Sequence, residues 1–130
     1  MFKIVTLGAV GLMATSLVLF APPVLAAGAA DEGMADFFAN TLVVSVPSAP
    51  WVDKRYLSPD HTYRDEGDSG DQRGTWVIEG GKLCVTPEKP SKYGAPRYCN
   101  PGPGKKLGEF WNDEDPITGN TVVFALTPGR

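Results

Sequence analysis

Turn-forming residues divide the chain into short segments, and this spacing restricts the fold more than any other feature of the sequence. After residue 40, glycine, proline and small polar clusters recur at intervals of about ten residues. The intervening segments, about seven in number, are rich in β-branched and aromatic residues and have the length of β-strands. Such an arrangement is typical of antiparallel sandwiches and small barrels. We therefore expect a mainly β domain of one of these two kinds.

The stretch GTWVIEGGKLCV, Gly74 to Val85, has the pattern of a tight β-hairpin. Gly80 and Gly81 suit the positive φ angles of a two-residue turn, and this turn would place Val77 opposite Cys84. Period-two alternation then assigns four apolar side chains to one face, which we expect to be core: Trp76, Ile78, Leu83 and Val85.

Two further segments have distinct patterns. In Asp31 to Asn40, the residues Met34, Phe37 and Phe38 have helical spacing, which predicts one short N-terminal helix. Residues 64–73, RDEGDSGDQR, contain no apolar residue, which predicts a flexible acidic loop between strands.

His61 is the only histidine in the sequence, and it lies in turn-forming surroundings. Tyr56 and Tyr63 flank the residues SPDH, which predicts a hairpin with Asp60 and His61 at its tip. Histidine is among the few residues other than glycine that are enriched at positive φ. As a plain turn residue, His61 could be replaced by glycine with equal or improved stability.

Residues 1–26 have the composition of a secretory signal peptide. Lys3 gives a basic start, an uncharged apolar run follows, and Val24 and Ala26 are small residues suited to cleavage after Ala26. An uncleaved membrane anchor is the alternative, because the run approaches the roughly 18 residues that span a bilayer. Cleavage would leave a single domain over residues 27–130, periplasmic or secreted and not attached to a membrane.

Cys84 and Cys99 both follow this leader. In an oxidising compartment, two cysteines in a small domain indicate a disulfide. Closing a loop of this length stabilises a fold by about 3 kcal/mol in the loop-entropy model. The prediction is therefore a structural disulfide rather than a reactive thiol.

The charge of the exported domain argues against nucleic acid as a partner. Of the 12 Lys and Arg residues one lies in the leader, so 11 basic side chains face 15 acidic ones and the net charge is near −4. Nucleic-acid binding depends on clustered basic residues. We expect a monomer whose partner is a protein or a small molecule.

The sequence contains few residues for catalysis. Two paired cysteines supply no thiolate, and a G-x-S-x-G motif is absent from the sequence. The enzyme alternative is a small periplasmic enzyme that acts on a polar or aromatic small molecule. In that alternative the general base is His61, beside Asp60, or a buried carboxylate, and Tyr56 or Tyr63 polarises the substrate.

Candidate metal ligands occur in residues 65–71 and in a second acidic cluster, Asn112, Asp113, Glu114 and Asp115. One histidine and two paired cysteines do not provide a zinc ligand set, so we expect no cofactor. Calcium needs only oxygen ligands on a loop, and the acidic segment offers them, although without the spacing of the helix–loop–helix calcium motif. The candidates in residues 65–71 are Asp65, Glu66, Asp68 and Asp71.

Aromatic residues are numerous for a domain of this size. Rings of this kind form the core of a small β domain, and rings on one sheet face also bind sugars or apolar ligands. The candidate ligand-binding residues are Trp51, Tyr56, Tyr93 and Trp111.

Five short motifs follow one another along the chain. They are NTL (40–42), PDHTYR (59–64), GTW (74–76), GGKLC (80–84) and YC (98–99). In this order the chain resembles small secreted bacterial proteins of uncharacterised function, which typically have Asp-Gly-Thr where this chain has Asp60-His61-Thr62. The resemblance implies an exported β domain and carries over no active site.

These features favour an exported binding or interaction module over an enzyme, chiefly because each catalytic arrangement is incomplete. Its ligand would be a small molecule or a protein, as for small secreted inhibitors of hydrolases, a comparison that rests on size and compartment alone.

Overall fold

The computed structural model describes residues 31–130, so the leader predicted over residues 1–26 lies outside the described part. The described chain forms one short helix and eight strands. These elements are α1 (Ala35–Phe38), β1 (Thr41–Val46), β2 (Trp51–Leu57), β3 (Thr62–Gly67), β4 (Gln72–Glu79), β5 (Lys82–Pro87), β6 (Tyr98–Pro101), β7 (Phe110–Glu114) and β8 (Thr121–Thr127). Within residues 31–130, no helix has the length and apolar character needed to cross a membrane.

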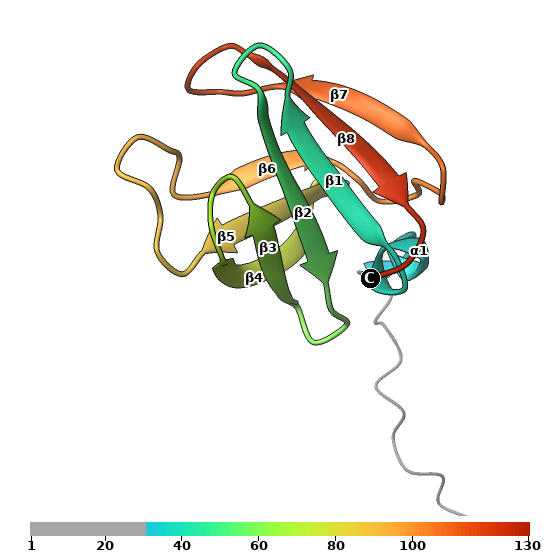
Figure 1. The fold of residues 1–130 in the computed structure, drawn as a ribbon. Coiled ribbons are helices and arrows are strands. Elements are labelled where there is room, and N and C mark those ends of the chain that lie inside the picture. Colours follow the sequence, from blue (N-terminus) through green and yellow to red (C-terminus); the bar gives the residue numbers. More distant parts are fainter. Residues whose placement is uncertain (1–30) are drawn as a thin grey trace, which may run out of the picture.

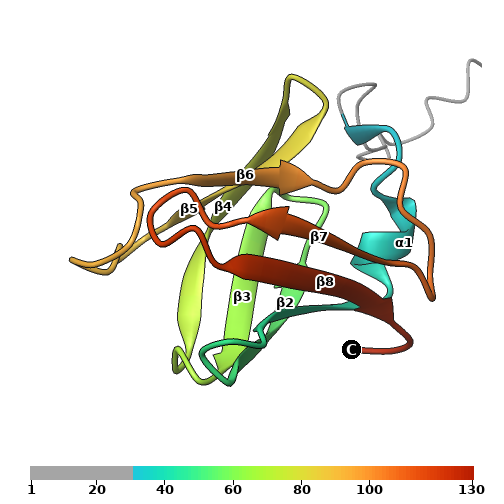
Figure 2. The ribbon, with the colours of Figure 1, turned by 90° about the horizontal axis from the view of Figure 1, so that it is seen from above.

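All eight strands belong to one antiparallel sheet that curls into a nearly closed barrel (Figures 1 and 2). Strands β1 to β6 are successive neighbours, β8 pairs with the free side of β1, and β7 pairs with β8. The edge strands β6 and β7 are joined across a seam by side-chain hydrogen bonds. Asn100 Nδ2 donates to Asp113 Oδ2 at 3.1 Å, and Trp111 Nε1 donates to the backbone oxygen of Pro101 at 2.8 Å. The predicted mainly β fold is confirmed, and it is a barrel rather than a sandwich.

The β4–β5 hairpin has the predicted register. Gly80 and Gly81 form the turn at positive φ, and Val77 lies opposite Cys84. Cys84 in turn lies opposite Cys99 on β6, with the Cα atoms 4.0 Å apart, and the two form a disulfide. The predicted bond is confirmed, and it fastens the edge strand β6 to the hairpin.

Helix α1 covers one end of the barrel, which we call the closed end. Met34, just before the helix, and Phe37 within it are almost fully buried, because both pack against the apolar interior of the strands. The Phe37 ring meets the Trp111 ring edge-on, with centroids 6.2 Å apart. The predicted N-terminal helix is thus confirmed. The core beneath it includes Leu42, Leu57, Trp76, Leu83 and Leu126.

The C-terminal residues also reach the closed end (Figure 1). Gly129 accepts a hydrogen bond from Thr41 Oγ1 at 2.6 Å, and its own N–H donates to Asn40 Oδ1 at 3.1 Å. Arg130 Nη1 donates to the backbone oxygen of Leu57 at 2.8 Å. The last residues therefore seal the space beside α1.

The prediction of a flexible acidic loop over residues 64–73 is wrong. Strand β3 continues to Gly67 and β4 begins at Gln72, so only a short turn separates them. The segment forms strands without apolar residues because Asp65 faces the barrel interior and pairs there with Arg55. At this position inside the barrel, the Arg55–Asp65 ion pair replaces the apolar contacts found elsewhere in the sheet.

Candidate functional site

The end of the barrel opposite α1, which we call the open end, is hollow. A cavity of about 380 Å³ lies between the β1–β2, β3–β4, β5–β6 and β7–β8 connections, since all four fall at the same end of an antiparallel barrel. This volume is at the lower end of the range for small-molecule sites, about 300–1,000 Å³. Its apolar wall is formed by Val44, Val46, Trp51, Val85, Tyr98, Val122 and Phe124.

Strands β2 and β3 place charged side chains in this cavity. Strand alternation turns Asp53 and Arg55 inward from β2, and Tyr63 and Asp65 inward from β3. Arg55 and Asp65 are direct partners in the register. Nε and Nη2 of Arg55 donate to the two carboxylate oxygens of Asp65 at 2.8 and 2.7 Å. The guanidinium also lies over the Tyr63 ring, 4.9 Å from its centroid.

The surroundings of Arg55 and Tyr63 raise the pKa of both groups. Burial acts to lower the pKa of Arg55, but the hydrogen bond and the charge of Asp65 outweigh it and raise that pKa above its ordinary value. Burial raises the pKa of Tyr63 to about 12, although the charge of Arg55 opposes the shift. At neutral pH the cavity therefore contains a charged guanidinium stacked on a neutral phenol.

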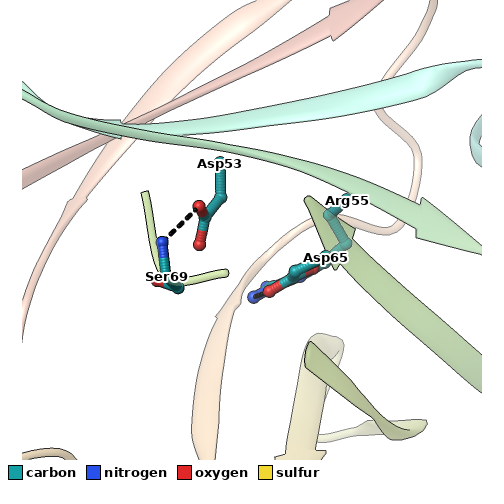
Figure 3. A network of polar contacts seen from close by, with 4 residues as sticks. All are labelled: Asp53, Arg55, Asp65 and Ser69. Carbon is teal, nitrogen blue, oxygen red and sulfur yellow. Dashed lines mark hydrogen bonds and ion pairs between the residues drawn. The ribbon is translucent and has the colours of Figure 1, made fainter. Parts of the chain in front are cut away.

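Asp53 is the least expected side chain in the barrel, because it is 1% exposed and carries a carboxylate (Figure 3). Its Oδ1 accepts a hydrogen bond from the backbone N–H of Ser69 at 3.0 Å. Its Oδ2 is buried and has no hydrogen-bond partner in the described chain. An oxygen left in this condition destabilises a fold by about 1–3 kcal/mol. Packing alone does not explain why Oδ2 of Asp53 is buried without a hydrogen-bond donor from residues 31–130.

The β3–β4 turn holds Asp53 in place. Gly67, at φ +145°, lies so close to β2 that an added Cβ would be 2.4 Å from the backbone oxygen of Val52 and 2.6 Å from Asp53 Oδ1. Only glycine allows this approach. On the outer side of the turn, Asp68 Oδ2 accepts a hydrogen bond from the Val52 N–H at 2.8 Å. The turn thus folds over β2 and fixes the orientation of the Asp53 carboxylate.

The charged groups of the cavity give it a net negative charge. Those in its described lining are Asp53, Arg55, Asp65 and Asp115, with no lysine or histidine. Arg55 and Asp65 form an ion pair. Asp115 is half-buried at the rim, where its Oδ1 accepts hydrogen bonds from the N–H groups of Ile117 and Thr118 at 2.7 and 3.1 Å. The charge of Asp53 acts on the same Arg55 guanidinium, so one cation faces two buried carboxylates and one negative charge is left over.

A second hollow, of about 330 Å³, lies around Tyr56. The guanidinium groups of Arg64 and Arg130 lie over the Tyr56 ring, with Cζ atoms 4.7 and 5.8 Å from its centroid. Arg73 and Glu88 also line this hollow. Tyr56 is thus covered by cationic side chains outside the barrel cavity.

His61 is in the β2–β3 turn with φ +67°, which confirms its place in a hairpin turn. Its imidazole is nevertheless fixed, since Nε2 lies 2.8 Å from Asp31 Oδ2 and the ring stacks on Trp76 with centroids 4.2 Å apart. Beside it, hydrogen bonds from the Thr62 side chain and backbone lower the pKa of Asp60. His61 lies at the closed end and lines neither hollow.

The other candidates drawn from the sequence are dispersed. Trp51 lines the barrel cavity, whereas Tyr93 is 78% exposed on the β5–β6 connection and Trp111 is buried in the core. Of the proposed calcium ligands, Asp65 pairs with Arg55 inside and Asp68 caps β2, while Glu66 and Asp71 lie on other sides of the segment. Among residues 31–130, no three His, Cys, Asp or Glu side chains are grouped so as to hold a metal ion.

Sequence reasoning missed Asp53 and Arg55, although a signal for both was present. In WVDKRYL the residues Trp51, Asp53, Arg55 and Leu57 alternate with the others and share one face. Because Trp51 and Leu57 are apolar, an inward orientation of that face would carry both charges into the barrel.

No protein-family model, curated protein or solved structure matches this chain. Inferences about its function therefore rest on the geometry of the barrel.

Proposed function

We propose that this protein binds a small organic molecule inside the open end of its barrel. The observation that carries this proposal is the cavity of about 380 Å³, which combines a mostly apolar wall with a few buried polar groups. Small-molecule sites have this composition, because apolar contacts provide affinity and a few polar groups fix orientation. Small barrels hold single ligands in the same position.

Binding, rather than catalysis, is favoured by what surrounds the cavity. His61, one of the two kinds of general base in the enzyme alternative, lies at the opposite end of the barrel. Arg55 and Asp65 are engaged with each other through paired hydrogen bonds. The cavity thus has the groups to orient a ligand and lacks a histidine or free cysteine in its described lining.

We further propose that the protein acts as an exported monomer. The Cys84–Cys99 disulfide supports an oxidising compartment such as the periplasm or the cell exterior. The leader-like residues 1–26 and the resemblance to small secreted bacterial proteins point the same way. A protein partner, as for a secreted inhibitor, would use the outer surface rather than the barrel interior.

The test is a binding assay with small probes and a variant that fills the cavity. The probes share an apolar body, either phenylbutyl or octyl, and carry a polar group at one end. Val46 is half-buried on β1 at the cavity wall, so Val46→Trp should fill the cavity and weaken probe binding by about tenfold or more. Isothermal titration calorimetry measures the affinities.

Val52→Trp is the matched control, because Val52 is 46% exposed on β2 and does not line the cavity. This variant should bind the probes as the parent protein does. If no probe binds the parent protein, or if both variants bind equally well, the barrel is not the binding site and the proposal fails.

A further inference from the structure

The buried carboxylate of Asp53 specifies which kind of molecule suits this cavity, and the inference rests on the proposed function. We infer that the ligand carries a protonated amine at one end of an apolar body, and that this ammonium group binds Asp53. The argument has three parts: the unused oxygen, the charge of the cavity and the shape of its wall.

The first part concerns the different roles of the two carboxylate oxygens of Asp53. Oδ1 has a structural role, since it accepts the Ser69 N–H and so holds the β3–β4 turn. An asparagine would fill that role without placing a charge in the barrel. Oδ2 has no partner in the described chain and costs stability where it lies. Such an oxygen is explained when a ligand supplies the missing donor.

The second part is electrostatic. Arg55 and Asp65 form a bidentate pair, and the charge of Asp53 also acts on Arg55, so one guanidinium balances only one of these two carboxylates. Asp53 remains deep in the wall and Asp115 at the rim, and no lysine or histidine in the described lining compensates them. A cationic donor therefore gains from both carboxylates, whereas an anionic ligand would meet two like charges in a poorly solvated space.

The third part is the placement of the apolar wall. Trp51 and Val46 lie on the strands β2 and β1 next to Asp53, and Phe124 and Val122 line the wall from β8. A ligand with its ammonium group at Asp53 would place its apolar body against these residues. Trp51, which was predicted as a ligand residue from the sequence, would then contact the ligand and report on it by fluorescence.

The experiment compares probes that differ only in their end group. Phenylbutyl and octyl bodies are each prepared with an ammonium, a hydroxyl and a carboxylate end, and their affinities are measured by calorimetry at neutral pH. The ammonium probe should bind about tenfold or more tightly than the matched alcohol, and the carboxylate probe should bind most weakly. This comparison uses the unaltered protein and does not depend on a variant that folds.

The variant Asp53→Asn removes the charge and keeps an oxygen for the Ser69 N–H. It should abolish the preference for ammonium and change the affinity for the alcohol by no more than about threefold. Asp71→Asn is the matched control in the same connection, because Asp71 is exposed and outside the cavity. It should retain the full preference.

The outcomes separate this inference from the proposed function. If alcohols bind as tightly as amines, or if Asp53→Asn keeps the preference for ammonium, the inference is overturned while binding in the barrel stands. If none of the probes binds, the proposed function and the inference fail together.

Discussion

The closed and open ends of the barrel are made by the same strands and differ in what fills them. At the closed end, Met34 and Phe37 are buried among apolar side chains and complete the core. At the open end, the interior contains two aspartates and an arginine around a cavity. Strand β2 runs through both, from Asp53 at the cavity to Leu57 in the core. The difference indicates that one end provides the stability and the other is free to carry polar groups that stability does not require.

The largest expected effect tests the closed end. Phe37→Ala removes a buried ring from beneath the helix, and it should lower the free energy of unfolding by about 3–5 kcal/mol in urea denaturation. Phe110→Ala is the control, since Phe110 is 80% exposed, and should change stability by no more than about 0.5 kcal/mol. A loss below about 1 kcal/mol for Phe37→Ala would show that α1 does not complete the core.

A somewhat smaller effect is expected from the ion pair at the open end. Arg55→Met leaves Asp65 buried without its partner, which should cost about 3 kcal/mol. The double variant Arg55→Met/Asp65→Leu removes both charges and should recover most of that loss in the same denaturation assay. If the stability loss in the double variant equals the sum of the losses in Arg55→Met and Asp65→Leu, the pair is not coupled. This end of the barrel is then more hydrated than its geometry suggests.

The turn at His61 gives the next prediction. Turn geometry alone would make glycine neutral or better at φ +67°. The contacts with Asp31 and Trp76 reverse that expectation, so His61→Gly should lower the free energy of unfolding by about 1 kcal/mol, the net of relieved strain and lost contacts. Equal or higher stability in thermal denaturation would show that His61 is only a turn residue.

The last prediction concerns Tyr63, which lines the cavity and whose effect appears only at alkaline pH. Its pKa of about 12 in the folded protein exceeds that of an unfolded tyrosine, about 10. The folded state therefore binds this proton more tightly, and the resulting stability is complete below pH 10 and is lost as the pH rises to 12. Ultraviolet titration should show one tyrosine that ionises late, and Tyr63→Phe should remove it. If all four tyrosines ionise together near pH 10, the cavity wall does not shield Tyr63 from water.

Local patterns were sufficient to predict the parts of the fold that depend on neighbouring residues. The Gly80–Gly81 turn set the register of β4 and β5, and two cysteines in an exported chain were enough to predict the disulfide. Barrel closure could not be predicted in this way, because β1 pairs with β8 across almost the whole chain.

The candidate site was predicted only in part, for a related reason. Trp51 was predicted as a ligand residue from its type and surroundings, and it lines the cavity. Asp53 and Arg55 were passed over because charged side chains in strands usually face solvent. Their inward position becomes a prediction only when the alternation in β2 is combined with the pairing of Arg55 with Asp65 on β3, which depends on the register of a second hairpin.

The hydrogen bonds of Gly129 and Arg130 to the closed end have a practical consequence for handling this protein. They place the C-terminus, like Asp31 and α1, on the side away from the cavity mouth (Figure 1). A surface or affinity tag joined after Arg130 would leave the mouth directed outward. Immobilisation through the C-terminus would thus present every molecule in one orientation, with its cavity open to the flowing solution.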